Sequence, residues 1–367
     1  MRLAVDAEDF LARYWQRRPL FLPAGLPGFR PPADADELAG LALEPGVDAR
    51  IVRGSDAAGW STRRAPLEVA DLQRPGPFTL LVQAVDQYWE EAATLLDALP
   101  FLPRWRLADV LMSYASDGGS AGPHFDRYDV FIVGGEGERC WQLGQRCTAQ
   151  TPLRPVPGLG LLADFRPEAE YRLRCGDVLY IPPGVAHCGV SRGDSTSFSI
   201  GLRAPRLADL LARCTDVTLD GLDDDALLAD AARPAAPRPG EFTAGDVARA
   251  RAQLQALLDR AHPRWFGEVL TQAAEDEDAP VAALPGAGPL ALRLVPGRRL
   301  TWMDRGAQLL VCAAGDSCHC PPQLAPALQQ LCSGAALPLP AGHLDAPLRR
   351  LLQWLLDRAT LHIDDDD

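Results

Sequence analysis

The chain of 367 residues contains no lysine, so all 36 of its basic residues are arginine. Chemistry that needs a lysine amine is therefore excluded, both Schiff-base formation and the lysine of a phosphate-binding loop. The arginines are outnumbered by 49 acidic residues, which gives a formal net charge of −13. Because nucleic-acid binding rests on cationic contacts with phosphate, we expect no direct need for nucleic acid and favour a basic partner.

Long apolar runs are also absent. No stretch of about 18 apolar residues occurs, and the first ten residues are acidic and polar, so we expect neither a membrane-spanning helix nor a secretory signal. The nine cysteines are odd in number and have no repeated spacing, which favours reduced thiols over a disulfide framework. Together these absences predict a cytoplasmic protein without membrane attachment.

One run of possible metal ligands, 318–320, reads Cys-His-Cys. Zinc sites usually space their ligands along the chain, because three consecutive residues do not readily converge on one tetrahedral ion. We therefore interpret this run as part of an ordinary strand or turn.

Residue patterning divides the chain into three predicted domains, 1–205, 206–280 and 281–367. The first contains short helical patterns, at 9–16, 36–43 and 88–96, and then short β-prone runs separated by Gly and Pro. These runs, which are typical of a β-barrel or sandwich, lie at 129–133, 140–143, 178–181 and 197–202.

The two later domains differ in pattern. In the helical domain, residues 246–261 place apolar side chains on one helix face, which packs either on its own chain or on a second subunit. The last domain combines alternating leucines at 290–294 with two helices, 323–332 and 347–359, the second beginning at Asp345 as N-cap. A small α+β module of winged-helix size fits this pattern.

Three residues form a candidate metal site. His124 and Asp126 lie two apart, which on a strand points both side chains to one face, and His187 follows a predicted strand and a Pro-Pro-Gly turn. Two histidines and one carboxylate on one face of a metal leave adjacent positions open, as in non-haem iron(II) oxygenases. The three residues alone do not distinguish iron from zinc or manganese.

A positively charged residue on a neighbouring predicted strand could bind a carboxylate of a cosubstrate. Arg139 shares a predicted strand face with Trp141 and Leu143. A buried arginine needs an anionic partner, and a carboxylate suits its planar fork. On this pattern alone, an exposed arginine paired with Glu138 remains an equal alternative.

Several segments closely resemble the bacterial ribosomal oxygenases of the JmjC/cupin type: 122–132, 139–141, 176–187 and 201–205, with further likeness at 9–19, 37–40, 80–85 and 265–268. The likeness weakens after residue 285. The resemblance implies an α+β protein, with a double-stranded β-helix (jelly roll), a helical dimerisation segment and a winged-helix-like C-terminal domain.

The resemblance also implies an activity, the hydroxylation of an arginine β-carbon in the large-subunit ribosomal protein L sixteen by a homodimer that uses O₂. Fe(II) would be bound by His124, Asp126 and His187, and the distal carboxylate of 2-oxoglutarate by Arg139. Ser197 stands where we expect an asparagine near the cosubstrate, and a serine could act there through water.

The substrate side of the site is less specified. From position alone, Asp117, Tyr114 and Tyr128 are plausible contacts for a substrate guanidinium. The same metal residues would serve a histidine hydroxylase or a lysine demethylase. A non-catalytic cupin/winged-helix regulatory protein is the alternative from another class.

Overall fold

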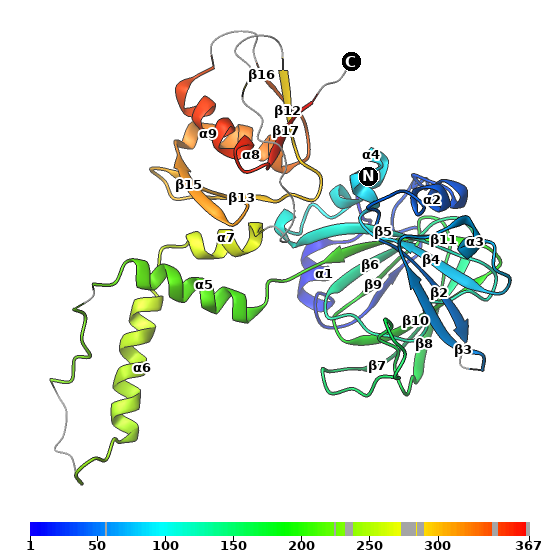
Figure 1. Cartoon of the computed structure of the whole chain (residues 1–367), viewed down its shortest axis with the longest axis horizontal. Helices are drawn as coiled ribbons and strands as arrows, with labels where there is room; N and C mark the ends of the chain where they lie inside the picture. Colours follow the sequence, from blue (N-terminus) through cyan, green and yellow to red (C-terminus); the bar gives the residue numbers. More distant parts are fainter. Residues whose placement is uncertain are drawn as a thin grey trace. The chain divides into compact units, whose positions relative to one another are not determined.

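The computed structural model describes residues 1–55, 57–223, 225–231, 238–272, 284, 290–339 and 344–364 (Figure 1). The chain forms two compact units, Met1–Ala204 and Pro205–Asp367. The boundary between these two units lies next to the predicted domain boundary at 205. The predicted boundary at 280 falls outside the described residues, so the three-domain division stays a prediction.

The first unit is built mainly of antiparallel strands. They are β1 (Leu20–Leu22), β2 (Ala49–Ser55), β3 (Gly59–Arg64), β4 (Phe78–Val82), β5 (Leu107–Ala115), β6 (Asp129–Gly134), β7 (Glu138–Arg146), β8 (Pro167–Leu173), β9 (Val178–Ile181), β10 (Val185–Arg192) and β11 (Ser195–Leu202). The predicted strands at 129–133, 140–143, 178–181 and 197–202 are thus confirmed within longer or equal elements.

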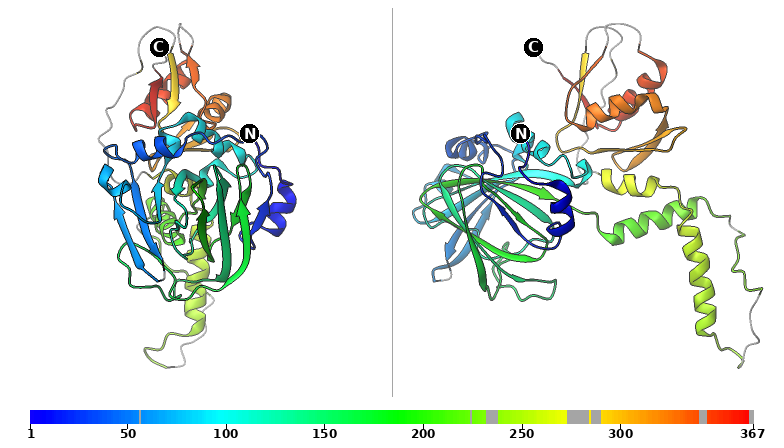
Figure 2. Two further views of the ribbon diagram at one scale, coloured as in Figure 1. Left: turned by 90° about the vertical axis from the view of Figure 1, so that its right-hand side faces the viewer. Right: turned by 180° about the vertical axis from the view of Figure 1, so that it is seen from behind.

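These strands form two sheets. The larger has the order β1-β9-β6-β11-β5-β4-β2-β3, and the smaller has the order β10-β7-β8. Figure 2 shows the strands curving around a common interior, which is the predicted jelly roll of the cupin type. Because strand side chains alternate, Val130 and Ile132 of β6 pack with the smaller sheet, whereas Phe131 and Val133 pack in the core behind the larger one.

Short helices cover the outer side of the larger sheet. They are α1 (Ala7–Arg13), α2 (Ala35–Leu41), α3 (Val69–Leu72) and α4 (Glu90–Ala93), with the 3₁₀ helices η1 (Val85–Gln87), η2 (Thr94–Ala98) and η3 (Arg104–Arg106). A capping box between Asp34 and Glu37 starts α2, close to the predicted position. The helical pattern predicted over 88–96 is found as α4 followed directly by η2, whose Leu95, Leu96 and Ala98 are buried.

The second unit contains α5 (Leu207–Asp220), α6 (Ala244–Leu258), α7 (Arg264–Thr271), η4 (Pro322–Leu324), α8 (Ala325–Cys332) and α9 (Ala346–Leu356). Two sheets accompany them, β16-β12-β17 and β13-β14-β15. Their strands are β12 (Leu290–Leu294), β13 (Leu300–Asp304), β14 (Leu309–Ala313), β15 (Asp316–Cys320), β16 (Leu337–Leu339) and β17 (Leu361–Asp364). The mixed α+β character is confirmed, and the winged-helix type stays a prediction.

Smaller predictions in the second unit have mixed outcomes. The Cys-His-Cys run lies on β15, as expected of an ordinary strand, and all nine cysteines are free thiols. Asp345 is the N-cap residue of α9, as predicted, and its side chain makes no capping hydrogen bond. Among the described residues no helix is long and apolar enough to cross a membrane.

Candidate active site

The loop between β5 and β6 carries His124 and Asp126. Neither residue is on a strand, so the predicted reason for their convergence was wrong. Instead, His124 pairs with His187 in an isolated antiparallel bridge. The His124 N–H donates to the His187 carbonyl oxygen at 3.0 Å, and the His187 N–H donates to the His124 carbonyl oxygen at 2.8 Å. Residues directly paired in this way point to the same side of the ladder, and the two imidazole centroids lie 4.3 Å apart.

Asp126 is held beside them by the Pro182-Pro183-Gly184 turn. The Gly184 N–H donates to the Asp126 carbonyl at 2.8 Å, and Asp126 Oδ2 lies 3.5 Å from His187 Nε2. Gly184 has a φ of +77°, and a Cβ there would meet the Cys147 carbonyl oxygen at 2.8 Å, so the turn requires glycine. One ligand atom from each of the three residues lies within 4.8 Å of the other two.

The protonation of both imidazoles suits a metal. His124 Nδ1 lies 2.8 Å from the Gly122 carbonyl, and His187 Nδ1 lies 2.9 Å from the Val185 carbonyl. Since a carbonyl only accepts, each Nδ1 carries hydrogen, so in the neutral ring the lone pair is on Nε2. Burial, and then the neighbouring His124, lower the pKa of His187, which favours the neutral ligand form. The donor set therefore fits a divalent transition metal.

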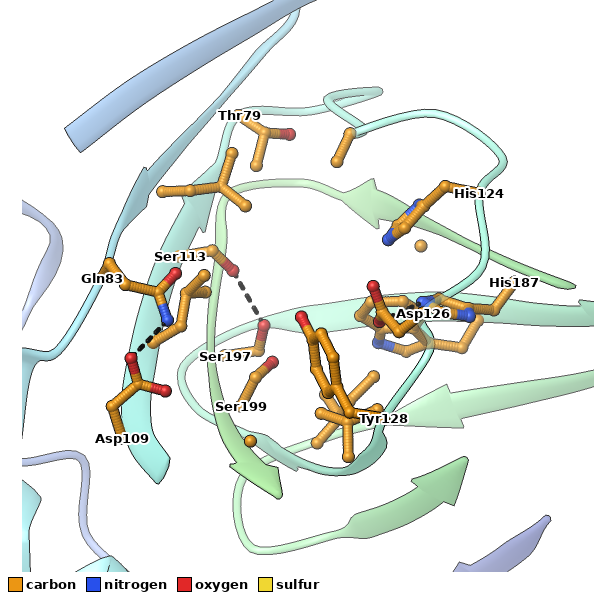
Figure 3. Close-up of a pocket in the computed structure, with 18 of the residues that line it drawn as sticks. Thr79, Gln83, Asp109, Ser113, His124, Asp126, Tyr128, His187, Ser197 and Ser199 are labelled. Atoms are coloured by element: carbon orange, nitrogen blue, oxygen red, sulfur yellow. Dashed lines mark hydrogen bonds and ion pairs between the residues drawn. The ribbon is translucent and has the colours of Figure 1, made fainter. Parts of the chain in front are cut away.

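The triad opens into a pocket inside the jelly roll with about 940 Å³ of space, part of it open to solvent (Figure 3). Its polar lining comes from both sheets: Arg50, Thr79, Gln83, Asp109, Ser113, His124, Asp126, Tyr128, Arg139, Trp141, His187, Ser197, Ser199 and Arg203. The predicted metal ligands, Arg139 and Ser197 are thus brought into one cavity.

Arg139 is buried in the pocket wall, 5% exposed. Its guanidinium donates only to neutral groups: Nε to Ser195 Oγ (3.1 Å), Nη1 to two serine hydroxyls, and Nη2 to the Ser195 carbonyl (3.0 Å). No carboxylate of the described chain pairs with it, and Glu138 pairs with Arg174 instead. Burial lowers the pKa of Arg139 to about 10, so it is still charged at neutral pH. This is a buried cation that lacks an anion.

The two hydroxyls on Nη1 belong to Ser113 of β5 and Ser197 of β11, at 2.7 and 2.9 Å. Their oxygens lie 3.0 Å apart, so one O–H can donate to the other hydroxyl (Figure 3). The O–H of the second serine then has no acceptor in the described part of the chain. Both residues are buried, so a ligand oxygen in the pocket is the natural acceptor.

Two more buried polar atoms of the pocket-lining residues have no hydrogen-bond partner among the residues described: Thr79 Oγ1 and Trp141 Nε1. Trp141 lies two positions after Arg139 on β7, on the same face as predicted, and its ring centroid is 5.9 Å from that of His187. Native proteins leave few such groups unpaired. Unpaired donors on residues that line the same pocket as a cation and a metal triad fit a ligand with several oxygen atoms.

Of the three residues predicted to contact the substrate guanidinium, only Tyr128 lines the pocket. Tyr128 lines the pocket near Asp126 (Figure 3). Tyr114 lies outside it and packs against Phe78, because it follows Ser113 on β5 and takes the opposite face. Asp117 also lies outside, where its Oδ1 accepts the Gly193 N–H at 2.7 Å.

Sequence reasoning missed a second carboxylate in the pocket. Asp109 lies on β5, on the same face as Leu111 and Ser113, and all three line the cavity. Gln83 Nε2 donates to Asp109 Oδ2 at 2.7 Å. The signal that could have found Asp109 and Ser113 is strand alternation, had 107–115 been predicted as a strand with an inward face.

Comparison with known proteins agrees with this fold. A family model described as the JmjC domain matches residues 94–210. The chain is 34% identical over 279 residues to the ribosomal protein uL16 3-hydroxylase of Escherichia coli K12, covering 76% of this chain and 74% of that protein.

Solved structures extend the likeness to almost the whole length. An X-ray structure of E. coli ycfD has a TM-score of 0.80 and 30% identity, covering 99% of this chain and 100% of that one. A structure of the E. coli ribosomal oxygenase YcfD in complex with cobalt and 2-oxoglutarate has a TM-score of 0.78 and 29% identity, covering 99% of each chain.

Fold, triad and relatives together define a JmjC-type dioxygenase that depends on 2-oxoglutarate. Within that class, the chain belongs to the ribosomal oxygenases, the family that includes the uL16 3-hydroxylase of E. coli.

Proposed function

We propose that this protein hydroxylates the β-carbon of an arginine side chain in ribosomal protein uL16, with Fe(II), 2-oxoglutarate and O₂. The related E. coli enzyme is named for 3-hydroxylation of that protein. The observation that carries the proposal is the buried Arg139, which has only neutral partners and lines the same pocket as the His-Asp-His triad. A dicarboxylate between the two would supply the missing anion.

In this proposal, His124, Asp126 and His187 hold Fe(II) through two imidazole nitrogens and one carboxylate. Bound iron, 2-oxoglutarate and O₂ supply the oxidising power for an unactivated C–H bond. Arg139, supported by hydroxyl groups, holds the distal carboxylate and so fixes the cosubstrate along the pocket.

The target arginine needs a carboxylate of its own. Asp109 supports this role, because Gln83 holds its Oδ2 and no ion pair of the described chain uses its Oδ1. An amide donor fixes the carboxylate without neutralising it, so the charge stays available for a guanidinium. Tyr128 adds an aromatic wall beside Asp126. A guanidinium held at Asp109 leaves the β-carbon free to face the triad.

The test is a turnover assay with iron, 2-oxoglutarate and peptides from uL16. We expect the wild-type protein to form succinate and add the mass of one oxygen atom to one arginine, and we expect His124→Ala to do neither. Peptides with a target histidine or methylated lysine test the related activities. Folded, metal-loaded wild-type protein that oxidises none of the arginine peptides would disprove the proposed substrate.

We also propose that the protein acts as a homodimer through α5 and α6. The apolar face of α6 is only partly covered by its own unit, since Val247 and Leu254 are exposed whereas Leu257 and Leu258 are half-buried. On α5, Leu211 is 60% exposed. Exposed apolar residues that cluster on neighbouring helices are typical of a subunit interface. A basic ribosomal protein as substrate fits the expected cytoplasmic location and needs no nucleic acid.

Light scattering after gel filtration tests the dimer. We expect twice the chain mass for the wild type and the single mass for a Leu211→Asp/Leu254→Asp variant. A wild-type protein that elutes with the mass of one chain at micromolar concentration would disprove the dimer.

A further inference from the structure

A row of polar side chains crosses one end of the larger sheet. Arg50 lies on β2, Gln83 follows β4, Asp109 lies on β5, Arg203 follows β11, and Tyr128 precedes β6. These strands are adjacent in the sheet, and all five residues line the pocket. Asp126 also precedes β6, so the row borders the metal end of the pocket.

The two arginines of this row differ from Arg139 in their surroundings. Neither Arg50 nor Arg203 has a side-chain hydrogen bond or an ion pair with any residue that the structure describes. Arg50 is half-buried and Arg203 is exposed. Both lie near Tyr128. Burial raises the pKa of the Tyr128 phenol, and the positive charges of Arg203 and Arg50 act to lower it. Two guanidinium groups with unused donors therefore lie on either side of Asp109 in the row.

A bound peptide would meet these donors with its main chain. A guanidinium carries five N–H donors and no acceptor, so it needs oxygen atoms from the ligand. A basic substrate protein has few carboxylates, but every residue has a main-chain carbonyl oxygen. The two arginines also repel any other cationic side chain at this end of the pocket, which leaves Asp109 as the favourable place for one guanidinium.

We propose that Arg50 and Arg203 hold the substrate chain on both sides of the target arginine by donating to its main-chain carbonyl oxygens. They would thereby act as specificity residues for an extended peptide. This inference rests on the proposed function, because it takes the substrate to be an arginine within a polypeptide.

The test compares Arg50→Met, Arg203→Met and their double variant with Arg64→Met. Arg64 pairs with Arg50 across β2 and β3, is exposed and lies outside the pocket, so it is a control for loss of charge. The affinity of a uL16 peptide is measured without O₂ on protein loaded with metal and 2-oxoglutarate. Each pocket variant should weaken peptide binding by at least about 10-fold, the lower bound for one hydrogen bond to a charged group.

Two further measurements make the result specific. The affinity for 2-oxoglutarate should be the same in all variants. Pentylguanidine, which has a guanidinium group but no main-chain carbonyl, should bind the wild type and the pocket variants with much more similar affinities than the peptide does. Peptide affinities equal to that of Arg64→Met, or equal losses for peptide and pentylguanidine, would overturn the inference. Hydroxylation by the wild type reports on the proposed function separately, since the binding measurements need no turnover.

Discussion

The Ser113–Ser197 pair leads to a quantitative prediction about cosubstrate binding. Each hydroxyl accepts from Arg139 Nη1, at 2.7 and 2.9 Å, and the two oxygens are 3.0 Å apart. In Ser113→Ala or Ser197→Ala, the remaining hydroxyl still accepts from Nη1. Its O–H no longer has a serine neighbour and can turn to the ligand. Either serine alone therefore preserves both functions of the pair.

The magnitude follows from what each variant loses. A single variant loses one acceptor of Nη1 and the bond between the hydroxyls but keeps an O–H for the ligand. A net loss of about 1 kcal/mol then weakens 2-oxoglutarate binding by less than about 10-fold. The double variant leaves Nη1 without either hydroxyl acceptor and removes the O–H donor to the carboxylate. Hydrogen bonds to charged groups contribute about 1.5–3 kcal/mol each, so the double variant should bind more than about 100-fold more weakly. The double loss should exceed the product of the single losses.

Calorimetric titration of 2-oxoglutarate into metal-loaded protein without O₂ measures these affinities. The control ligand is 2-oxopentanoate, which has the same keto-acid end and no distal carboxylate, and which should bind the wild type and the double variant equally. Metal content and thermal unfolding establish that the double variant is folded. Single losses that multiply to give the double loss would refute the shared role of the two hydroxyls.

Three other predictions follow from the site. His124→Ala should abolish metal binding, measured by elemental analysis, with a melting temperature close to that of the wild type. Gly184→Ala should lower stability by about 1–3 kcal/mol and weaken metal binding, because it strains the turn that holds Asp126; Gly160→Ala, in open space, is the control for chemical denaturation. Because the pKa of Arg139 is lowered to about 10, affinity for 2-oxoglutarate should stay constant through neutral pH and fall as the pH rises through 10; a decline centred near neutral pH would contradict this reasoning.

The hydrogen-bond partners of Arg139 could not be predicted from the neighbouring sequence. Strand alternation correctly placed it on one face with Trp141, but pairing with Glu138 remained an equal alternative. The choice depends on Ser113, Ser195 and Ser197, which are distant in sequence and reach Arg139 across strands β5 and β11. Nothing in the neighbourhood of residue 139 encodes those partners, because sheet register is a property of the whole fold.

The sequence by itself predicted a β-barrel or sandwich and three candidate metal ligands, because short β-prone runs and the His-x-Asp spacing are local patterns, and the resemblance to ribosomal oxygenases implied the jelly roll. Tertiary structure decided how the triad converges. An isolated bridge from His124, on the loop between β5 and β6, to His187 on β10 brings the imidazoles together. It also decided which polar residues enter the pocket, admitting Asp109 and excluding Tyr114 and Asp117. Those outcomes depend on which strand faces are enclosed by the second sheet, and that requires long-range packing.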